Sequence, residues 1–215
     1  MPVAALAQQP FDLPDEAATE ALAARFAHGL IAWQLANPHN GGVQIHLHGD
    51  LGAGKTAFVR AVLRALGHAG RVRSPTYTLV EPYKMTLQKA TPTSLPVPAT
   101  PAPQTSPSPP SPMPDAELPA NAAPVSLLVN HFDLYRFSDP AEWHEAGFDE
   151  YLGGQAINMI EWPSRAAEAL GTPDLLLNIV IASDARATNE RLNARVLTAQ
   201  AFTPAGIHCL SEVSR

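Results

Sequence analysis

The pattern of apolar and polar positions predicts alternating helices and strands along most of the chain. Leu22, Phe26 and Leu30 recur at intervals of four residues, which places them on one face of a helix spanning residues 16–35. Shorter periodic runs predict a second helix at residues 57–66 and strands at residues 43–48, 76–83, 127–133, 156–162, 175–182 and 195–199. Such alternation is typical of an α/β sandwich, and we expect some of its strands to be antiparallel.

A segment rich in proline interrupts this pattern. Twelve of the 22 prolines lie between Pro92 and Pro124, and residues 90–114 contain no charged side chain. Such a composition cannot bury enough apolar surface to offset the entropy of ordering, so we expect a disordered loop at about residues 86–124. Closing these 39 residues rather than about five costs only about 2 kcal/mol more. The sequence therefore predicts a single domain over residues 1–215 that this insert interrupts.

Composition narrows the class of protein further. At 215 residues, 46% of them hydrophobic, the chain can bury a sizeable core, and its net charge of −6 argues against a broad nucleic-acid-binding surface. The single cysteine, Cys209, excludes an internal disulfide framework and a multi-cysteine zinc site. The longest strongly apolar run, residues 175–182, is too short to cross a bilayer, and the N-terminus lacks the basic start of a signal peptide. We expect a cytoplasmic protein without membrane contact.

The chemistry is concentrated in the segment GDLGAGKT, residues 49–56, which matches the pattern G-x-x-x-x-G-K-[ST] in full. Its glycines let backbone N–H groups turn toward phosphate oxygens, and the following helix adds the positive end of its dipole. Lys55 can reach the β- and γ-phosphates, and the Thr56 hydroxyl can bind Mg²⁺. The nucleotide-binding residues predicted here are Gly49, Asp50, Leu51, Gly52, Ala53, Gly54, Lys55, Thr56 and Ala57.

A phosphate loop of this kind needs an acidic partner at the end of another strand, and two residues qualify. Asp133 ends the run LLVNHFD and Glu161 ends the run INMIE. A carboxylate beside a buried strand is costly unless it meets a metal or a hydrogen-bond donor. We therefore expect Lys55, Asp133 and Glu161 to form the catalytic group.

Four ordered segments together resemble one family. The segments GDLGAGKT, SPTYTLVEPY, HFDLYR and IEWP are similar to those of the TsaE family, formerly called YjeE. The resemblance implies a P-loop NTPase-like three-layer α/β sandwich with a mixed central sheet, which binds ATP and Mg²⁺ and hydrolyses ATP. It also implies a role in bacterial synthesis of threonylcarbamoyladenosine, the modified adenine beside the anticodon of tRNA. The partner would be the TsaB–TsaD transferase pair, and the chain would contact tRNA only indirectly, through its complex with that pair.

The resemblance also assigns roles to individual residues. Thr56 and Glu161 would be associated with the metal, and Asp133 would be needed for hydrolysis. Ser74, Pro75 and Thr76 would lie in a switch-like loop, in which Thr76 could sense the γ-phosphate.

Other assignments stay open at this stage. Trp162 would report nucleotide state or contact the partner, although a core tryptophan fits the sequence equally well. The base pocket would use Asp15 or Glu16 together with a late arginine; we take Glu16 and Arg191 as candidates, and Arg195 competes with Arg191.

A small P-loop kinase that phosphorylates a metabolite is the alternative. Such kinases usually close a lid whose arginines clamp the phosphates, and the proline-rich insert contains no arginine. The insert is also a departure from the family, in which that connection is short. A second departure is Ala57, where the family often has threonine.

Deleting residues 90–120 should leave folding and ATP binding unchanged, because the insert cannot contribute buried apolar surface. Thermal unfolding and a nucleotide titration of the shortened chain test this. Loss of cooperative unfolding would show instead that the insert is structural.

Overall fold

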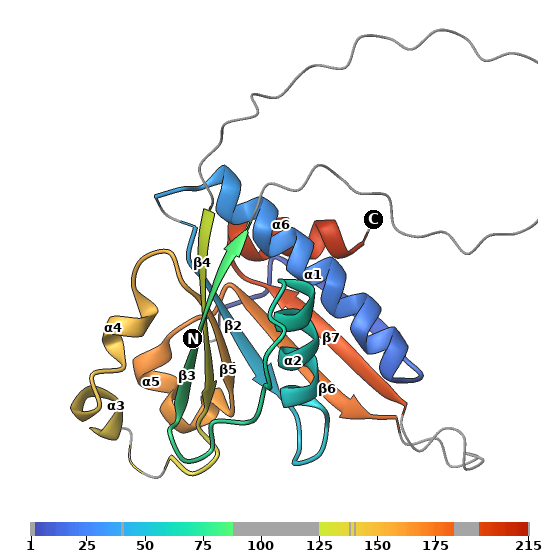
Figure 1. The fold of residues 1–215 in the computed structure, drawn as a ribbon. Helices are drawn as coiled ribbons and strands as arrows, with labels where there is room; N and C mark the ends of the chain where they lie inside the picture. The colour runs from blue at the N-terminus through green and yellow to red at the C-terminus, as the bar shows by residue number, and fades with distance from the viewer. Residues whose placement is uncertain are drawn as a thin grey trace, which may run out of the picture.

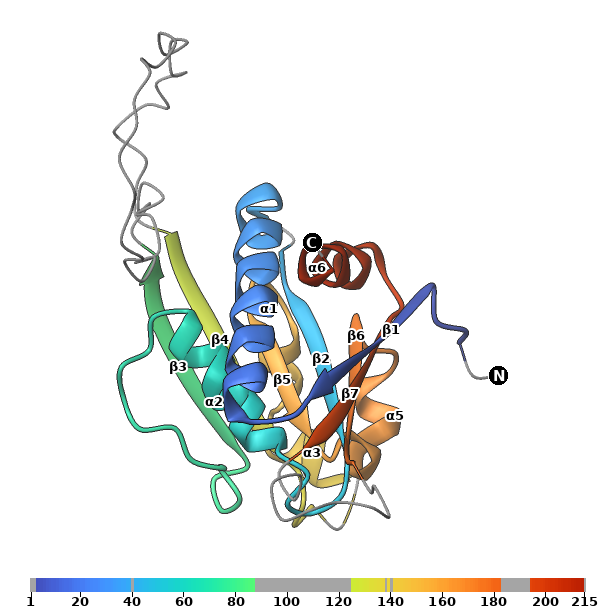
Figure 2. The same cartoon turned by 90° about the vertical axis from the view of Figure 1, so that its right-hand side faces the viewer.

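The protein folds around one mixed seven-stranded sheet with helices on both faces (Figure 1, Figure 2). The computed structural model describes residues 3–39, 41–87, 125–137, 139, 141–182 and 194–214. Across the sheet the strands follow the order β1-β7-β6-β2-β5-β4-β3. The three-layer α/β architecture with a mixed sheet, implied by the resemblance, is therefore confirmed.

Four parallel strands form the centre of the sheet. They are β6 (Leu175–Ile181), β2 (Val43–His48), β5 (Ile157–Glu161) and β4 (Val125–Asp133). Helices cover both faces, which explains why all five residues of β5 are buried. Because the strands are parallel, their carboxyl ends meet at one edge of the sheet, where ligands of open α/β sheets bind.

Antiparallel strands complete the sheet on both sides. β7 (Arg195–Ala201) pairs with β6 and with β1 (Ala7–Leu13), a strand that the sequence pattern did not predict. On the other side β3 (Val80–Leu87) pairs antiparallel with β4 from Val80↔Phe132 to Leu87↔Val125, so the two strands that flank the insert form a hairpin.

The boundaries expected around this hairpin were partly wrong. Residues 76–79 are turn and bend rather than strand, because Leu79 adopts a left-handed backbone with φ of 62° that cannot continue a ladder. Thr86 and Leu87, expected in the disordered loop, belong to β3 because they pair with Ser126 and Val125. The rest of the expected loop, residues 88–124, lies outside the described residues.

The two faces of the sheet carry different helices (Figure 1). Two longer helices, α1 (Glu16–Ala36) and α2 (Lys55–Ala65), cover one face, and α6 (Pro204–Val213) packs against α1. The other face carries the short helices α3 (Ala141–Glu145), α4 (Asp149–Leu152), η1 (Pro163–Ala166) and α5 (Ala167–Leu170). In the part of the chain that the structure describes, no helix has the length and apolar character needed to span a membrane.

Each face has its own apolar core. Under α1 and α2, Phe26 and Phe58 meet edge to face with ring centroids 5.7 Å apart, and both are fully buried. On the opposite face Trp143 stacks on Phe132 at 5.7 Å and meets the ring of Phe148 at 5.2 Å. The sheet is thus held between two cores, which fixes the strand ends that carry the polar residues described below.

Gly206 shows how tightly α6 is fitted to the sheet. A Cβ at this position would lie 2.0 Å from the carbonyl oxygen of Asp174, the residue just before β6. We expect Gly206→Ala to lower the free energy of unfolding by about 1–3 kcal/mol, as overpacking does. Gly153→Ala is the matched control, because a Cβ there meets no atom within 4 Å. Chemical denaturation of both variants measures the difference, and equal stabilities would contradict this packing.

Candidate nucleotide-binding site

The glycine-rich segment forms a tight loop between the end of β2 and the start of α2. Gly49 has φ of 139°, and a Cβ there would lie 2.3 Å from the carbonyl oxygen of Ile179, so only glycine fits. Gly54, with φ of 110°, directly precedes the first residue of α2. Residues 49–57 thus take the strand–loop–helix arrangement that the sequence motif predicts, with the helix N-terminus at the loop.

Lys55, the first residue of α2, points back into the loop rather than outward. Its ammonium group donates hydrogen bonds to the carbonyl oxygens of Gly49, at 2.7 Å, and Asp50, at 3.0 Å. Nζ also lies 3.8 Å from the centre of the Trp162 ring, a cation–π contact. Burial lowers the pKa of Lys55, while the carboxylates of Glu161, Asp133 and Asp50 act to raise it. The lysine is therefore held inside the loop that it would complete around phosphates.

Trp162 belongs to the wall of this site, and its role in nucleotide sensing or partner contact stays a prediction. Its backbone is left-handed, with φ of 58°, and its ring packs on Tyr135 with centroids 5.1 Å apart. It is half-buried and also packs against the apolar core on the α3–α5 face of the sheet. On the same edge of the sheet, burial and the charge of Lys55 lower the pKa of His48, which favours a neutral imidazole beside the loop.

The two predicted acids do lie side by side. Asp133 and Glu161 are paired residues of β4 and β5, and both are almost fully buried. The Thr56 hydroxyl donates a hydrogen bond of 2.7 Å to Oε1 of Glu161. A hydroxyl has one hydrogen and two lone pairs, so Thr56 can make this bond and still offer its oxygen to a cation. These residues fit Mg²⁺, a hard cation that prefers oxygen ligands.

Asp133 connects the site to the expected switch segment. Its Oδ2 accepts hydrogen bonds from the hydroxyls of Ser74 and Thr76, the latter at 3.1 Å, and its Oδ1 accepts one from the Tyr135 N–H. Pro75, between the two hydroxyl residues, accepts a backbone bond of 2.6 Å from Leu79. The segment 74–76 therefore lies against the acid, and its response to nucleotide stays a prediction.

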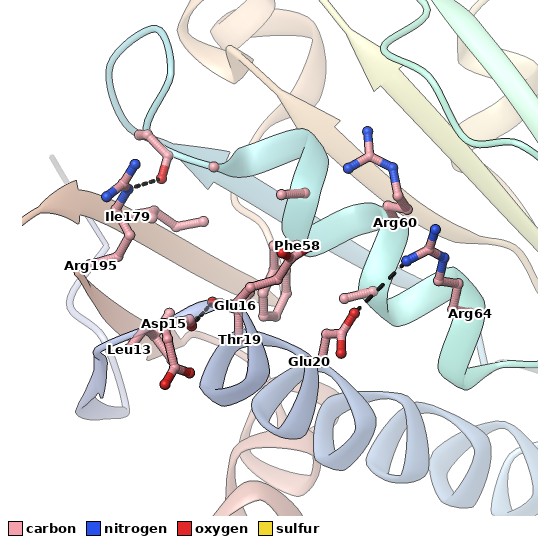
Figure 3. A pocket seen from close by; sticks show the side chains of 14 residues that line it. Leu13, Asp15, Glu16, Thr19, Glu20, Phe58, Arg60, Arg64, Ile179 and Arg195 are labelled. Atoms are coloured by element: carbon pink, nitrogen blue, oxygen red, sulfur yellow. Dashed lines mark hydrogen bonds and ion pairs between the residues drawn. The ribbon is translucent and has the colours of Figure 1, made fainter. Parts of the chain in front are cut away.

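A cavity of about 510 Å³ opens on the α1 side of the loop (Figure 3). Glu16 lines it from the first turn of α1, while Asp15 caps that helix by accepting the Ala18 N–H at 2.8 Å. Arg195, at the start of β7, also lines the cavity, and its Nε donates to the carbonyl oxygen of Ala53 at 3.0 Å. Arg191 lies outside the described residues. Of the two competing arginines, Arg195 is thus the one seen at this cavity.

A second cavity, of about 470 Å³, opens on the other side of the helix start. Its lining includes Lys55, Thr56, Asp133, Glu161 and Trp162. The two cavities share three lining residues, namely Gly54, Ala57 and Arg60. A nucleotide laid over the start of α2 could therefore place its base and ribose in the first cavity and its phosphates beside the acids.

Reasoning from the sequence missed one buried member of this site. His131 has no exposed surface, and its Nε2 lies 2.8 Å from Oε1 of Glu161. The signal was available, because positions 127, 129, 131 and 133 alternate along one strand and all but His131 and the terminal acid are apolar. A histidine on the buried side of a strand, two residues before an acid, indicates a polar contact inside the sheet.

Comparison with known proteins settles the family. The sequence profile described as "Threonylcarbamoyl adenosine biosynthesis protein TsaE" matches residues 13–93 and 120–192, more than half of the chain. The chain belongs to the TsaE family. A relative from Haemophilus influenzae, named tRNA threonylcarbamoyladenosine biosynthesis protein TsaE, is 30% identical over 174 residues, which cover 81% of this chain and 83% of that protein.

Further TsaE relatives match over shorter stretches. A Bacillus subtilis protein with the same name is 31% identical over 63% of this chain, and the match spans 58% of that protein. One from Rickettsia felis is 28% identical over 68% of this chain and 60% of that protein. Among solved structures, Bacillus subtilis YdiB superposes with a TM-score of 0.59 over 97% of this chain and 95% of that chain, at 23% identity. At that identity the likeness supports the fold.

The P-loop lysine can be tested by removing its charge. Lys55→Ala should weaken ATP binding roughly ten- to a hundredfold, because each charge-assisted hydrogen bond contributes about 1.5–3 kcal/mol. Lys84→Ala is the control, since it removes the same charge from an exposed position on the edge strand β3. Titration with a fluorescent ATP analogue measures both affinities. An unchanged affinity in a folded Lys55→Ala variant would rule out this loop as the phosphate site.

Proposed function

We propose that the chain is the ATP-binding and ATP-hydrolysing component of the bacterial machinery that makes threonylcarbamoyladenosine on tRNA. Membership of the TsaE family supports the pathway. The observation that carries the activity is the hydrogen bond from Thr56 of the phosphate loop to Glu161, with Asp133 paired beside it at the same sheet edge. We expect this protein to work in the cytoplasm, because its proposed role is in tRNA modification.

In this proposal each group at the edge of the sheet has one task. The N–H groups of residues 49–56 and the Lys55 ammonium bind the phosphates, while Thr56 and Glu161 hold Mg²⁺, which neutralises phosphate charge when bound. Asp133 orients the attacking water and accepts its proton. Glu16 and Arg195 line the cavity on the base side. The metabolite-kinase alternative is not favoured, because the chain belongs to a family of tRNA-modification proteins.

The nucleotide cycle would regulate the TsaB–TsaD pair rather than transfer a group to tRNA. The net charge of −6 disfavours direct binding of tRNA by this chain alone, and it supports the proposal that the chain contacts tRNA through its partners. The contact of Asp133 with Ser74 and Thr76 supports a link between the hydrolytic site and a segment that continues into the exposed Tyr77, through which a partner could sense the nucleotide.

ATP turnover with and without purified TsaB–TsaD tests the proposal. We expect slow turnover alone, faster turnover with the pair, and a fall of about a hundredfold or more in Glu161→Gln, as for loss of an acid–base or charge-positioning group. Glu168→Gln, an exposed position on α5, is the control and should behave as the wild type. Turnover that ignores the partners and instead phosphorylates a metabolite would overturn the assignment.

A further inference from the structure

His131 occupies a position where an apolar side chain would be expected. It lies in β4 between Val129 and Asp133 on the side of the sheet that faces α2, and none of its surface is exposed. Its register neighbour on β5 is Met159, and the preceding inward position on β4, Val129, is also fully buried. A fully buried histidine in such surroundings needs a specific polar partner to offset its desolvation.

Only one of its two ring nitrogens has that partner. Nε2 lies 2.8 Å from Oε1 of Glu161, whereas Nδ1 is buried and has no hydrogen-bond partner among the described residues. Leaving Nδ1 unpaired costs free energy that an apolar side chain of similar size would avoid. The bond to Glu161 is thus the one feature of His131 that leucine could not supply.

The bond acts on the carboxylate that the proposed function places nearest the metal. An ionised carboxylate only accepts, so Nε2 carries the hydrogen in this bond. Oε1 of Glu161 receives two donors, His131 Nε2 and Thr56 Oγ1, from β4 and α2 respectively. Among the described residues no hydrogen bond reaches Oε2. Two fixed donors on one oxygen set the rotation of the carboxylate and leave the other oxygen for Mg²⁺ or water.

We propose that His131 is a positioning residue, which holds Glu161 in the orientation needed for Mg²⁺-dependent ATP binding and hydrolysis. This inference rests on the proposed function. His131 itself does not reach the phosphates: it lines neither cavity and acts through Glu161. Its contribution should therefore appear only when Mg²⁺ is present and only when Glu161 is intact.

The test replaces the bond while keeping the packing. His131→Leu removes the donor, and we expect the half-saturating Mg²⁺ concentration to rise and kcat to fall, each by roughly tenfold, as for loss of one charge-assisted hydrogen bond. His131→Gln can still donate from its amide and should recover most of both values. Affinity for ATP in EDTA should be unchanged, and the melting temperature of His131→Leu should not fall. Calorimetric titration of ATP, with and without Mg²⁺, measures binding apart from turnover.

Two comparisons separate positioning from packing. His46→Leu is the matched control, because His46 is also a buried strand histidine but lies on the other face of the sheet, bonded to Gln44 at 2.8 Å. It should leave the Mg²⁺ dependence as in the wild type. In a double-mutant cycle, His131→Leu should have no further effect on Mg²⁺-dependent ATP binding in a Glu161→Gln background.

The outcomes also separate this inference from the proposed function. Wild-type Mg²⁺ dependence in His131→Leu, or equal loss in the leucine and glutamine variants with a lowered melting temperature, would overturn the positioning role and leave the ATPase proposal intact. If the wild-type protein itself showed no Mg²⁺-dependent ATP binding, the proposed function would fail and the positioning role with it.

Discussion

The hydrogen bond between Thr56 and Glu161 joins the two halves of the site, and most of the architecture serves it. Thr56 comes from the loop that follows β2, and Glu161 is the last residue of β5. They can meet because β2 and β5 are adjacent parallel strands: Leu47 pairs with Glu161, and the loop that leads into α2 begins just past that pair. An apolar core on each face holds the two strands in this register, and a slip of one residue would turn Glu161 away from α2.

The same edge of the sheet gathers an unusual density of buried polar groups. Lys55, His131, Asp133 and Glu161 are each at most 5% exposed. Burying any one of these groups alone would destabilise the fold. Together they form a hydrogen-bonded network. The two carboxylates accept from hydroxyl, imidazole and backbone amide donors, and the ammonium group donates to two carbonyl oxygens. Left-handed backbone at Leu79 and Trp162 adds about 1–3 kcal/mol of local strain at each position. Buried polar groups and strained backbone, both of which lower stability, are therefore concentrated at the edge of the sheet where the chemistry is expected.

Patterns that span a few residues of the sequence correctly predicted structural features formed by those same few residues. The loop at residues 49–56, the strand β2 and the paired acids were all found because glycine spacing, alternation and strand-end carboxylates are encoded over a few residues. The strand β1, the helix α6 and the short helices α3 to α5 were missed. β1 and α6 do alternate or repeat apolar positions, but Pro10 in the strand and Pro204 at the helix start obscured these short patterns. Arg195 could not be ranked against Arg191 from sequence, because its role depends on strands that meet only in three dimensions, whereas the alternation along residues 127–133 did carry a signal for His131 that was overlooked.

The order of strands has a consequence for how the protein is made. β2 is synthesised early, yet its two neighbours in the sheet, β5 and β6, begin at Ile157 and Leu175. β1 has no partner strand until even later in synthesis, because it pairs with β7, with Ala7 opposite Ala201. During translation the phosphate loop therefore emerges on a strand that has no partner until most of the chain has left the ribosome, and long-range pairings of this kind form slowly. For that interval β2 has unpaired backbone groups and an uncovered apolar face made by Val43, Ile45 and Leu47. Unpaired strand edges and exposed apolar surface of this kind favour aggregation, so the nascent chain is exposed to it before the sheet is complete.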